Sequence, residues 1–190
     1  MYNIMNIILS DSQFNIENLY FMEPIVNTIM DNSMFIKILY SNQLVTLNGL
    51  YLNMDINVTS NELYFKKIKY TYDVTNVHNN VILNKIYSIE SNILDKYVCS
   101  KPKSKKIIIY DTLKSGIIKI FPNQPNIYNN SDNSNSSLNI PNHNVNHNVN
   151  HNVNPNVNRN QSYHTSFILK ISGIWENETE YGVTYKLSTC

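Results

Sequence analysis

The sequence predicts a mainly β protein with one helix (β-rich α+β), built as a small antiparallel barrel that a disordered Asn-rich loop interrupts. Three observations predict it. Apolar and polar residues alternate in several short segments, which is the period of a strand with one buried face. A single segment, residues 81–97, has apolar residues at helical spacing instead. Residues 122–163 are polar and repetitive, so they bury too little apolar surface to fold.

The first half of the chain carries the strongest strand signals. Residues 34–40 are apolar and are expected to form a strand. Asn48-Gly49 lies between two apolar runs, and this dipeptide favours a two-residue hairpin turn. Residues 62–73, rich in lysine and aromatic residues, are expected to be extended as well. Between them, period-two alternation predicts one buried face made of Leu50, Leu52, Met54 and Ile56.

The middle of the chain is expected to form the helix and a second hairpin. The helix is predicted over residues 81–97, with Asn80 as its N-cap. Residues 107–113 and 117–121 flank a Lys-Ser-Gly sequence, which predicts two strands joined by a three-residue loop. The apolar face of the helix is expected to hold Ile82, Ile86, Ile89, Ile93 and Tyr97.

The end of the chain predicts a closing hairpin, formed by residues 167–175 and 183–187. Residues 164–190 are too few to bury a core of their own, so they are expected to pair with strands that precede the insertion. We therefore expect a single domain, residues 1–190, with residues 122–163 as a disordered low-complexity insertion within it. In the first closing strand, one face is expected to hold Phe167, Leu169, Ile171 and Trp175.

Short antiparallel strands, one helix between them and a closing hairpin favour an OB-like barrel of five strands that is partly open. The insertion then forms a long loop, which adds little closure entropy. It repeats the unit Asn-His-Asn-Val over residues 142–153. Because Asn-rich tracts promote assembly, a homo-oligomer is an open alternative.

No motif typical of an enzyme is present, so a non-catalytic protein without cofactor or metal is expected. The glycines form no phosphate-binding loop and no dinucleotide fingerprint. The histidines of the Asn-rich repeat lie in a tract that favours no helix, so no metal site is expected there. Glu176, Glu178 and Glu180 alternate, which suits either a Mg²⁺ nuclease or a solvated turn, and we favour the turn.

The sequence also indicates where the protein acts. No secretory signal is visible, and no apolar run approaches the roughly 20 residues that span a bilayer. Cys99 and Cys190 are expected to be free thiols in a reducing compartment. We expect an intracellular protein that is not secreted and does not contact a membrane.

Positive charge is concentrated in one segment. The net charge of the chain is +1, whereas residues 62–121 alone carry +6. Residues 64–72 interleave lysines with aromatic residues, and in an extended chain Tyr64, Lys66 and Tyr70 would share one face. Lysine neutralises phosphate with release of counterions, and tyrosine stacks on any base. The alternative is an edge strand with its tyrosines in the core and its lysines preventing edge pairing.

This pattern predicts binding of single-stranded nucleic acid. Because lysine acts as a point charge, the contacts are expected to be independent of base sequence. Trp175 is interpreted either as a stacking platform or as a core residue. The residues predicted to contact nucleic acid are Tyr64, Lys66, Lys67, Lys69, Tyr70, Lys103, Lys105, Lys106, Lys119 and Trp175.

Residues 167–176 and 181–187 resemble the end of a group of small proteins in nucleocytoplasmic large DNA viruses, and residues 89–97 and 113–120 fit the same group. Some of those viral proteins resemble OB-fold single-stranded-DNA-binding proteins. The resemblance implies a role in DNA replication and a location in the host cytoplasm or viral factory. The chain departs from that binding class at residues 186–190, where an acidic tail with a terminal aromatic residue is missing.

A structural or assembly protein, such as a minor virion component, is the alternative function. It would act through protein contacts of its sheet and Asn-rich loop, and the low overall charge together with the repeat favours it. The position of the lysines separates the two hypotheses. Lysines gathered on one surface with exposed aromatic residues favour nucleic-acid binding, and scattered lysines favour assembly.

Overall fold

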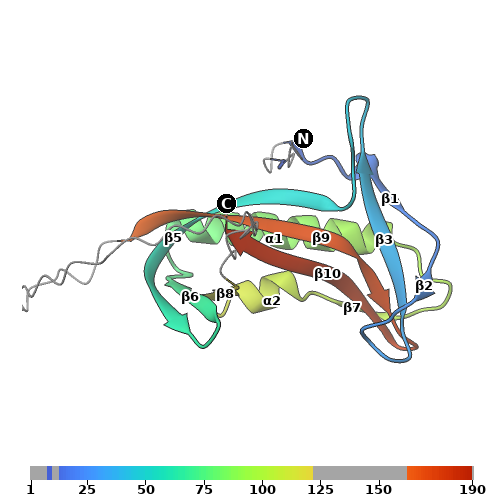
Figure 1. The fold of residues 1–190 in the computed structure, drawn as a ribbon. Helices are drawn as coiled ribbons and strands as arrows, with labels where there is room; N and C mark the ends of the chain where they lie inside the picture. Colours follow the sequence, from blue (N-terminus) through green and yellow to red (C-terminus); the bar gives the residue numbers. More distant parts are fainter. Residues whose placement is uncertain (1–7, 10–12, 122–161, 190) are drawn as a thin grey trace, which may run out of the picture. The chain divides into compact units, whose positions relative to one another are not determined.

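The computed structural model describes residues 8–9, 13–121 and 162–189 (Figure 1). Most of the predicted insertion, residues 122–161, lies outside the described residues. The insertion was predicted to end at residue 163, but Tyr163 is the first residue of a strand.

The protein is mostly antiparallel β sheet with one main helix, which confirms the predicted fold class. The helical elements are a short 3-10 helix (Ile16–Asn18), α1 (Val77–Lys96) and α2 (Ile109–Leu113). The strands are β1 (Leu19–Phe21), β2 (Ile25–Val26), β3 (Met34–Ser41), β4 (Thr46–Leu47), β5 (Leu50–Tyr64), β6 (Lys67–Tyr72), β7 (Ser104–Lys106), β8 (Ile117–Ile120), β9 (Tyr163–Glu176) and β10 (Glu180–Thr189).

Five antiparallel strands run in the order β10-β9-β5-β6-β8 and curve round α1 (Figure 1). The two outer strands of this series, β8 and β10, approach each other without forming a ladder, so the curved sheet resembles a partly open barrel. β9 is the central strand, paired with β10 on one edge and with β5 and then β3 on the other. At the far end, β1, β2 and β4 attach to β3, and β7 attaches in parallel to β10.

The core lies between the concave face of the sheet and α1. The predicted alternation in β5 is confirmed, because Leu50, Leu52, Met54 and Ile56 are all buried. From α1 the buried apolar residues are Leu83, Ile86, Ile89, Ile93 and Leu94. Burial of this helical face against the sheet stabilises a helix that would be marginal alone.

The helix begins earlier than predicted, because Asn76 rather than Asn80 is its N-cap. The Asn76 side chain accepts hydrogen bonds from the amides of His78 and Asn79. Asn79 is fully buried, and its side chain bonds both the N–H and the C=O of Asn57 in β5. The first turn of α1 is thereby fixed to the sheet.

Two predicted hairpins have a different structure. β4 pairs with β3 and not with β5, so Asn48-Gly49 is not a hairpin turn. Gly49 instead directs the chain onto β9, with φ of 106° and room for no side chain, since a Cβ would lie 2.8 Å from the Ile171 carbonyl oxygen. Residues 107–113 were expected to be a strand but end in α2. The buried carboxylate of Glu90 accepts hydrogen bonds from the backbone amides of Ile108, Ile109 and Tyr110. These bonds favour a helical turn at the start of α2.

Candidate functional site

The Lys- and Tyr-rich segment folds as a hairpin, not as one extended strand. β5 ends at Tyr64, the chain turns at Phe65 and Lys66, and β6 runs back beside it. Phe65 adopts φ of 55°, which allows the tight turn. The turn changes the predicted faces, so that Tyr64 now lies opposite Lys67 rather than on one face with Tyr70.

The outer surface of β5, β6 and β8 gathers lysines and aromatic rings. We call it the basic face and define it as Tyr64, Lys67, Lys69, Lys119 and Phe121. Lys119 Nζ lies 4.9 Å from the centre of the Tyr64 ring, and Lys67 Nζ lies 4.6 Å from that of Phe121. Lys69 and Lys119 are direct cross-strand neighbours. The two rings are 46% and 62% exposed, so both are accessible to a ligand.

One acidic residue reduces the charge of the basic face. Glu62 Oε1 accepts a hydrogen bond from Lys69 Nζ at 2.7 Å. Lys67 and Lys119 form no ion pair with any described residue, and Lys66 is exposed in the adjacent turn. Phe121 was not among the predicted residues. Its position two residues after Lys119, on the same face of an extended chain, was the signal that could have found it.

Tyr70 does not belong to this surface. It is 8% exposed and packs edge-on against Phe167, with ring centres 5.1 Å apart. Burial, with a smaller contribution from Tyr163, raises the pKa of the Tyr70 hydroxyl. Because the ring is covered by the core, the prediction that Tyr70 stacks on a base is wrong, and the alternative of a core tyrosine holds at this position.

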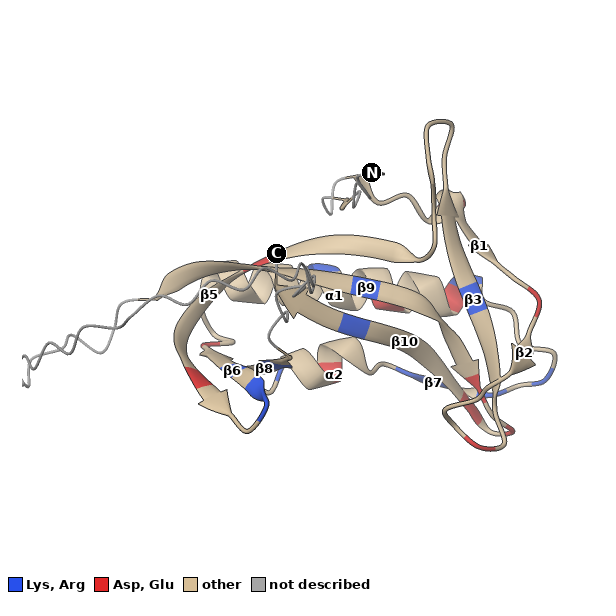
Figure 2. Ribbon diagram, viewed as in Figure 1, with Lys and Arg blue, Asp and Glu red and all other residues tan. Residues whose placement is uncertain are grey.

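The second predicted group of lysines lies at the other end of the sheet, on and beside β7 (Figure 2). Each of its members is paired with a carboxylate. Lys105 Nζ lies 2.7 Å from Asp95 and Lys106 Nζ lies 2.8 Å from Glu180. Lys103 is the most enclosed of the three and pairs with Glu176 at 2.5 Å. These lysines are therefore neutralised by carboxylates and do not extend the basic face.

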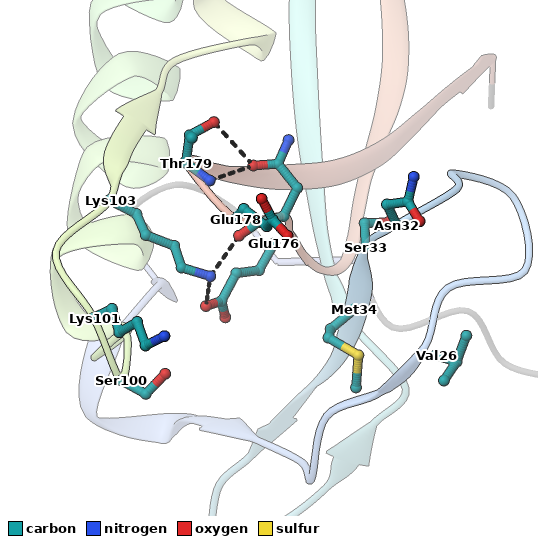
Figure 3. Close-up of a pocket in the computed structure, with 11 residues that line it drawn as sticks. Val26, Asn32, Ser33, Met34, Ser100, Lys101, Lys103, Glu176, Glu178 and Thr179 are labelled. Atoms are coloured by element: carbon teal, nitrogen blue, oxygen red, sulfur yellow. Dashed lines mark hydrogen bonds and ion pairs between the residues drawn. The ribbon is translucent and has the colours of Figure 1, made fainter.

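Figure 3 shows the surroundings of Lys103 in a hollow of about 880 Å³. Besides the Lys103 bond, the Glu176 carboxylate accepts a hydrogen bond from the hydroxyl of Tyr97. Burial alone would raise the pKa of Glu176, but the hydrogen bonds from Lys103 and Tyr97 hold it below its ordinary value. Burial and the negative charge of Glu176 raise the pKa of the Cys99 thiol, which is unpaired. A protonated thiol is a poor nucleophile.

The three alternating glutamates do not form a carboxylate cluster. Glu176 and Glu180 each bind a lysine, and Glu178 is exposed in the turn between β9 and β10. Within the described residues, no group of three or more His, Cys, Asp or Glu side chains is arranged to hold a metal ion.

Trp175 faces away from the core residues with which it was expected to align. Gly173 pairs with Thr184 and Ile171 with Tyr185, so Ser172 is an additional residue in β9, a β-bulge. The bulge reverses the alternation, and Trp175 turns to the outer surface. There it lines an apolar groove of about 550 Å³ together with Phe35, Ile108 and the residues before β3. Trp175 is thus separated from the basic face.

No helix in the described part of the chain has the length and apolar character needed to cross a bilayer. Comparison of the chain with family models, with curated proteins and with solved structures finds no match.

Proposed function

We propose that this protein binds single-stranded nucleic acid, without catalysing a reaction, through the basic face. The observation that carries the proposal is the pair of neighbouring lysine–aromatic contacts, Lys119 on Tyr64 and Lys67 on Phe121. Exposed rings provide stacking surfaces for bases, and the ammonium groups beside them are positioned for phosphates. Lys66 and Lys69 add charge at the same hairpin.

One feature supports binding that is independent of base sequence, and two support a single strand over a duplex. The described part of the face carries no arginine, and lysine contacts phosphate as a point charge without reading base edges. Among the described elements, no helix projects from this surface for insertion into a major groove. The rings of Tyr64 and Phe121 can stack only on bases that are not already stacked in a helix.

Fluorescence anisotropy with a labelled single-stranded oligonucleotide at two salt concentrations tests the proposal. Four lysine contacts predict a slope of about −3 for the logarithm of the binding constant against the logarithm of salt concentration. The triple variant Lys67→Ala, Lys69→Ala, Lys119→Ala is expected to lose most of the affinity. Lys105→Ala with Lys106→Ala is the control, since it removes lysines that are paired with carboxylates elsewhere. Absence of binding at low salt, or equal binding of a duplex, refutes the proposal.

A second candidate function, assembly through contacts between copies of this chain, has one observation in its favour. The hairpin before β3 exposes apolar side chains beside the apolar groove, with Val26 73% and Ile29 94% exposed. Apolar surface of this kind marks protein contacts. Sedimentation velocity tests it: self-association that Ile29→Asp abolishes supports assembly, and a monomer at all concentrations excludes it.

A further inference from the structure

A second group of lysines lies on the outer surface of the two strands that close the chain. Lys170 in β9 and Lys186 in β10 are direct cross-strand neighbours. Figure 2 shows basic residues on both β9 and β10. Lys170 Nζ lies 4.9 Å from the centre of the Tyr51 ring on the neighbouring strand β5. We call these three residues, Tyr51, Lys170 and Lys186, the second basic site.

The second basic site is adjacent to the basic face. A hollow of about 600 Å³ opens between β8 and β10, where the curved sheet is not closed by a ladder. Lys119 lines this hollow from β8 and Lys186 lines it from β10. Lys119 also contacts Tyr64, and Lys186 lies beside Lys170. The hollow therefore lies between the basic face, on the side of Lys119, and the second basic site, on the side of Lys186.

The local charge indicates an anion as the missing partner. Like charges at directly opposed positions of a sheet destabilise it. Such pairs occur twice here, at Lys69 with Lys119 and at Lys170 with Lys186. Glu62 offsets the first pair, whereas no described acidic residue forms an ion pair with Lys170 or Lys186. A phosphate bound between Lys170 and Lys186 would relieve their repulsion.

We propose that one nucleic-acid strand crosses the hollow and binds both sites, with Tyr51 as a second stacking platform. This inference rests on the proposed function, because it extends the same ligand beyond the basic face. The path from β6 over β8, β10 and β9 to β5 crosses three strand spacings of about 5 Å and the open side between β8 and β10, so it is roughly 20–25 Å long. At about 3.4 Å per stacked nucleotide, roughly seven nucleotides cover it.

The test compares binding of fluorescein-labelled dT4 and dT12 by anisotropy at two salt concentrations. The variant Lys170→Ala with Lys186→Ala is expected to bind dT12 about 10-fold more weakly, with a salt slope smaller by about 1.4. Binding of dT4, which covers only one site, is expected to change by less than about twofold. Lys105→Ala with Lys106→Ala, which removes the same number of lysines, is the matched control.

The outcomes separate the two proposals. Failure of the unmodified protein to bind either oligonucleotide overturns the proposed function, and this inference with it. Binding of dT12 that the double variant leaves unchanged, or weakens no more than binding of dT4, overturns the inference alone. A second variant, Lys186→Glu, distinguishes loss of binding from loss of the fold, because it places an opposite charge beside Lys170. It is expected to raise the melting temperature by about 1–3 °C while weakening dT12 binding.

Discussion

Lys103 and Glu176 form the most enclosed ion pair among the described residues, with Nζ 2.5 Å from Oε1 and side chains 11% and 10% exposed. Their bond joins the end of β9 to the segment that precedes β7. Loss of Lys103 would leave the Glu176 carboxylate charged, poorly solvated and without a partner, which lowers the free energy of unfolding. Removal of one partner alone is therefore expected to destabilise the fold.

Replacement of Lys103 by methionine is expected to lower the free energy of unfolding by about 2 kcal/mol at pH 7, because Glu176 stays charged and loses its partner. The folded-state pKa of Glu176 is lowered, so its stabilising contribution is present above the ordinary glutamate pKa and is lost as pH falls through the folded value. Urea unfolding at pH 7 and at pH 3 measures both effects. The difference between the variant and the unmodified protein is expected to shrink at pH 3.

Lys106→Met is the control for this experiment. Its partner Glu180 is considerably more exposed, so the loss is expected to stay under about 0.5 kcal/mol. Equal losses for the two variants would contradict the assignment of Lys103 and Glu176 as an enclosed pair.

Glu90 is expected to be essential for the segment between α1 and β8. Its fully buried carboxylate is the acceptor for three successive backbone amides, those of Ile108, Ile109 and Tyr110. Glu90→Ala leaves these amides without partners, and we expect a loss of about 3 kcal/mol in urea unfolding. Glu90→Gln keeps one carbonyl acceptor and is expected to cost about 2 kcal/mol. Asp111→Asn, on exposed α2, is the control and is expected to change stability little.

The same residue shows why part of the fold could not be predicted. Residues 107–113 are apolar and look like a strand, but Glu90, some 20 residues earlier, determines their backbone through its carboxylate. The strand pattern of β5 was readable because it depends only on alternation along one chain. The pairing partner of β4 could not be predicted from the sequence, because it depends on the position of β9 against Gly49.

The candidate site was predictable in composition but not in arrangement. Lys67, Lys69, Lys119 and Tyr64 were identified from their residue types, and the structure brings them onto one surface. The turn at Phe65 removed Tyr70 from it, and carboxylates distant in sequence neutralised Lys103. The second basic site escaped detection because Tyr51 and Lys170 are brought together only by the pairing of β5 with β9. No local pattern encodes such a contact.

Two glycines of the closing hairpin are expected to tolerate a methyl group differently. A Cβ at Gly173 would lie 2.5 Å from the backbone oxygen of Ile36, which cannot move without disturbing the ladder. A Cβ at Gly182 would meet side-chain atoms of Ile108 and Trp175 at 2.9 Å, and these can shift. We expect thermal unfolding to show a loss of about 3 kcal/mol for Gly173→Ala and about 1 kcal/mol for Gly182→Ala. Gly182→Ala should also shift the emission of the only tryptophan, which reports the displaced ring.

Tyr64 provides the sharpest test of stacking on the basic face. Tyr64→Ala removes the ring and is expected to weaken binding of single-stranded DNA by 1–3 kcal/mol, roughly 5- to 150-fold. Tyr64→Phe keeps the ring and should bind within about twofold of the unmodified protein. Because neither change removes a charge, the salt slope measured by anisotropy should stay constant in both. Tyr87→Ala, an exposed tyrosine on α1, is the control.

The Tyr64 series also separates stacking from a merely structural role of the ring. Lys119 packs on Tyr64, so loss of the ring also changes the position of an ammonium group. If Tyr64 acts only by holding Lys119, the salt slope falls in Tyr64→Ala by about 0.7, the value for one lost phosphate contact. An unchanged slope with weakened affinity identifies the ring itself as the contact, because base stacking releases no counterions.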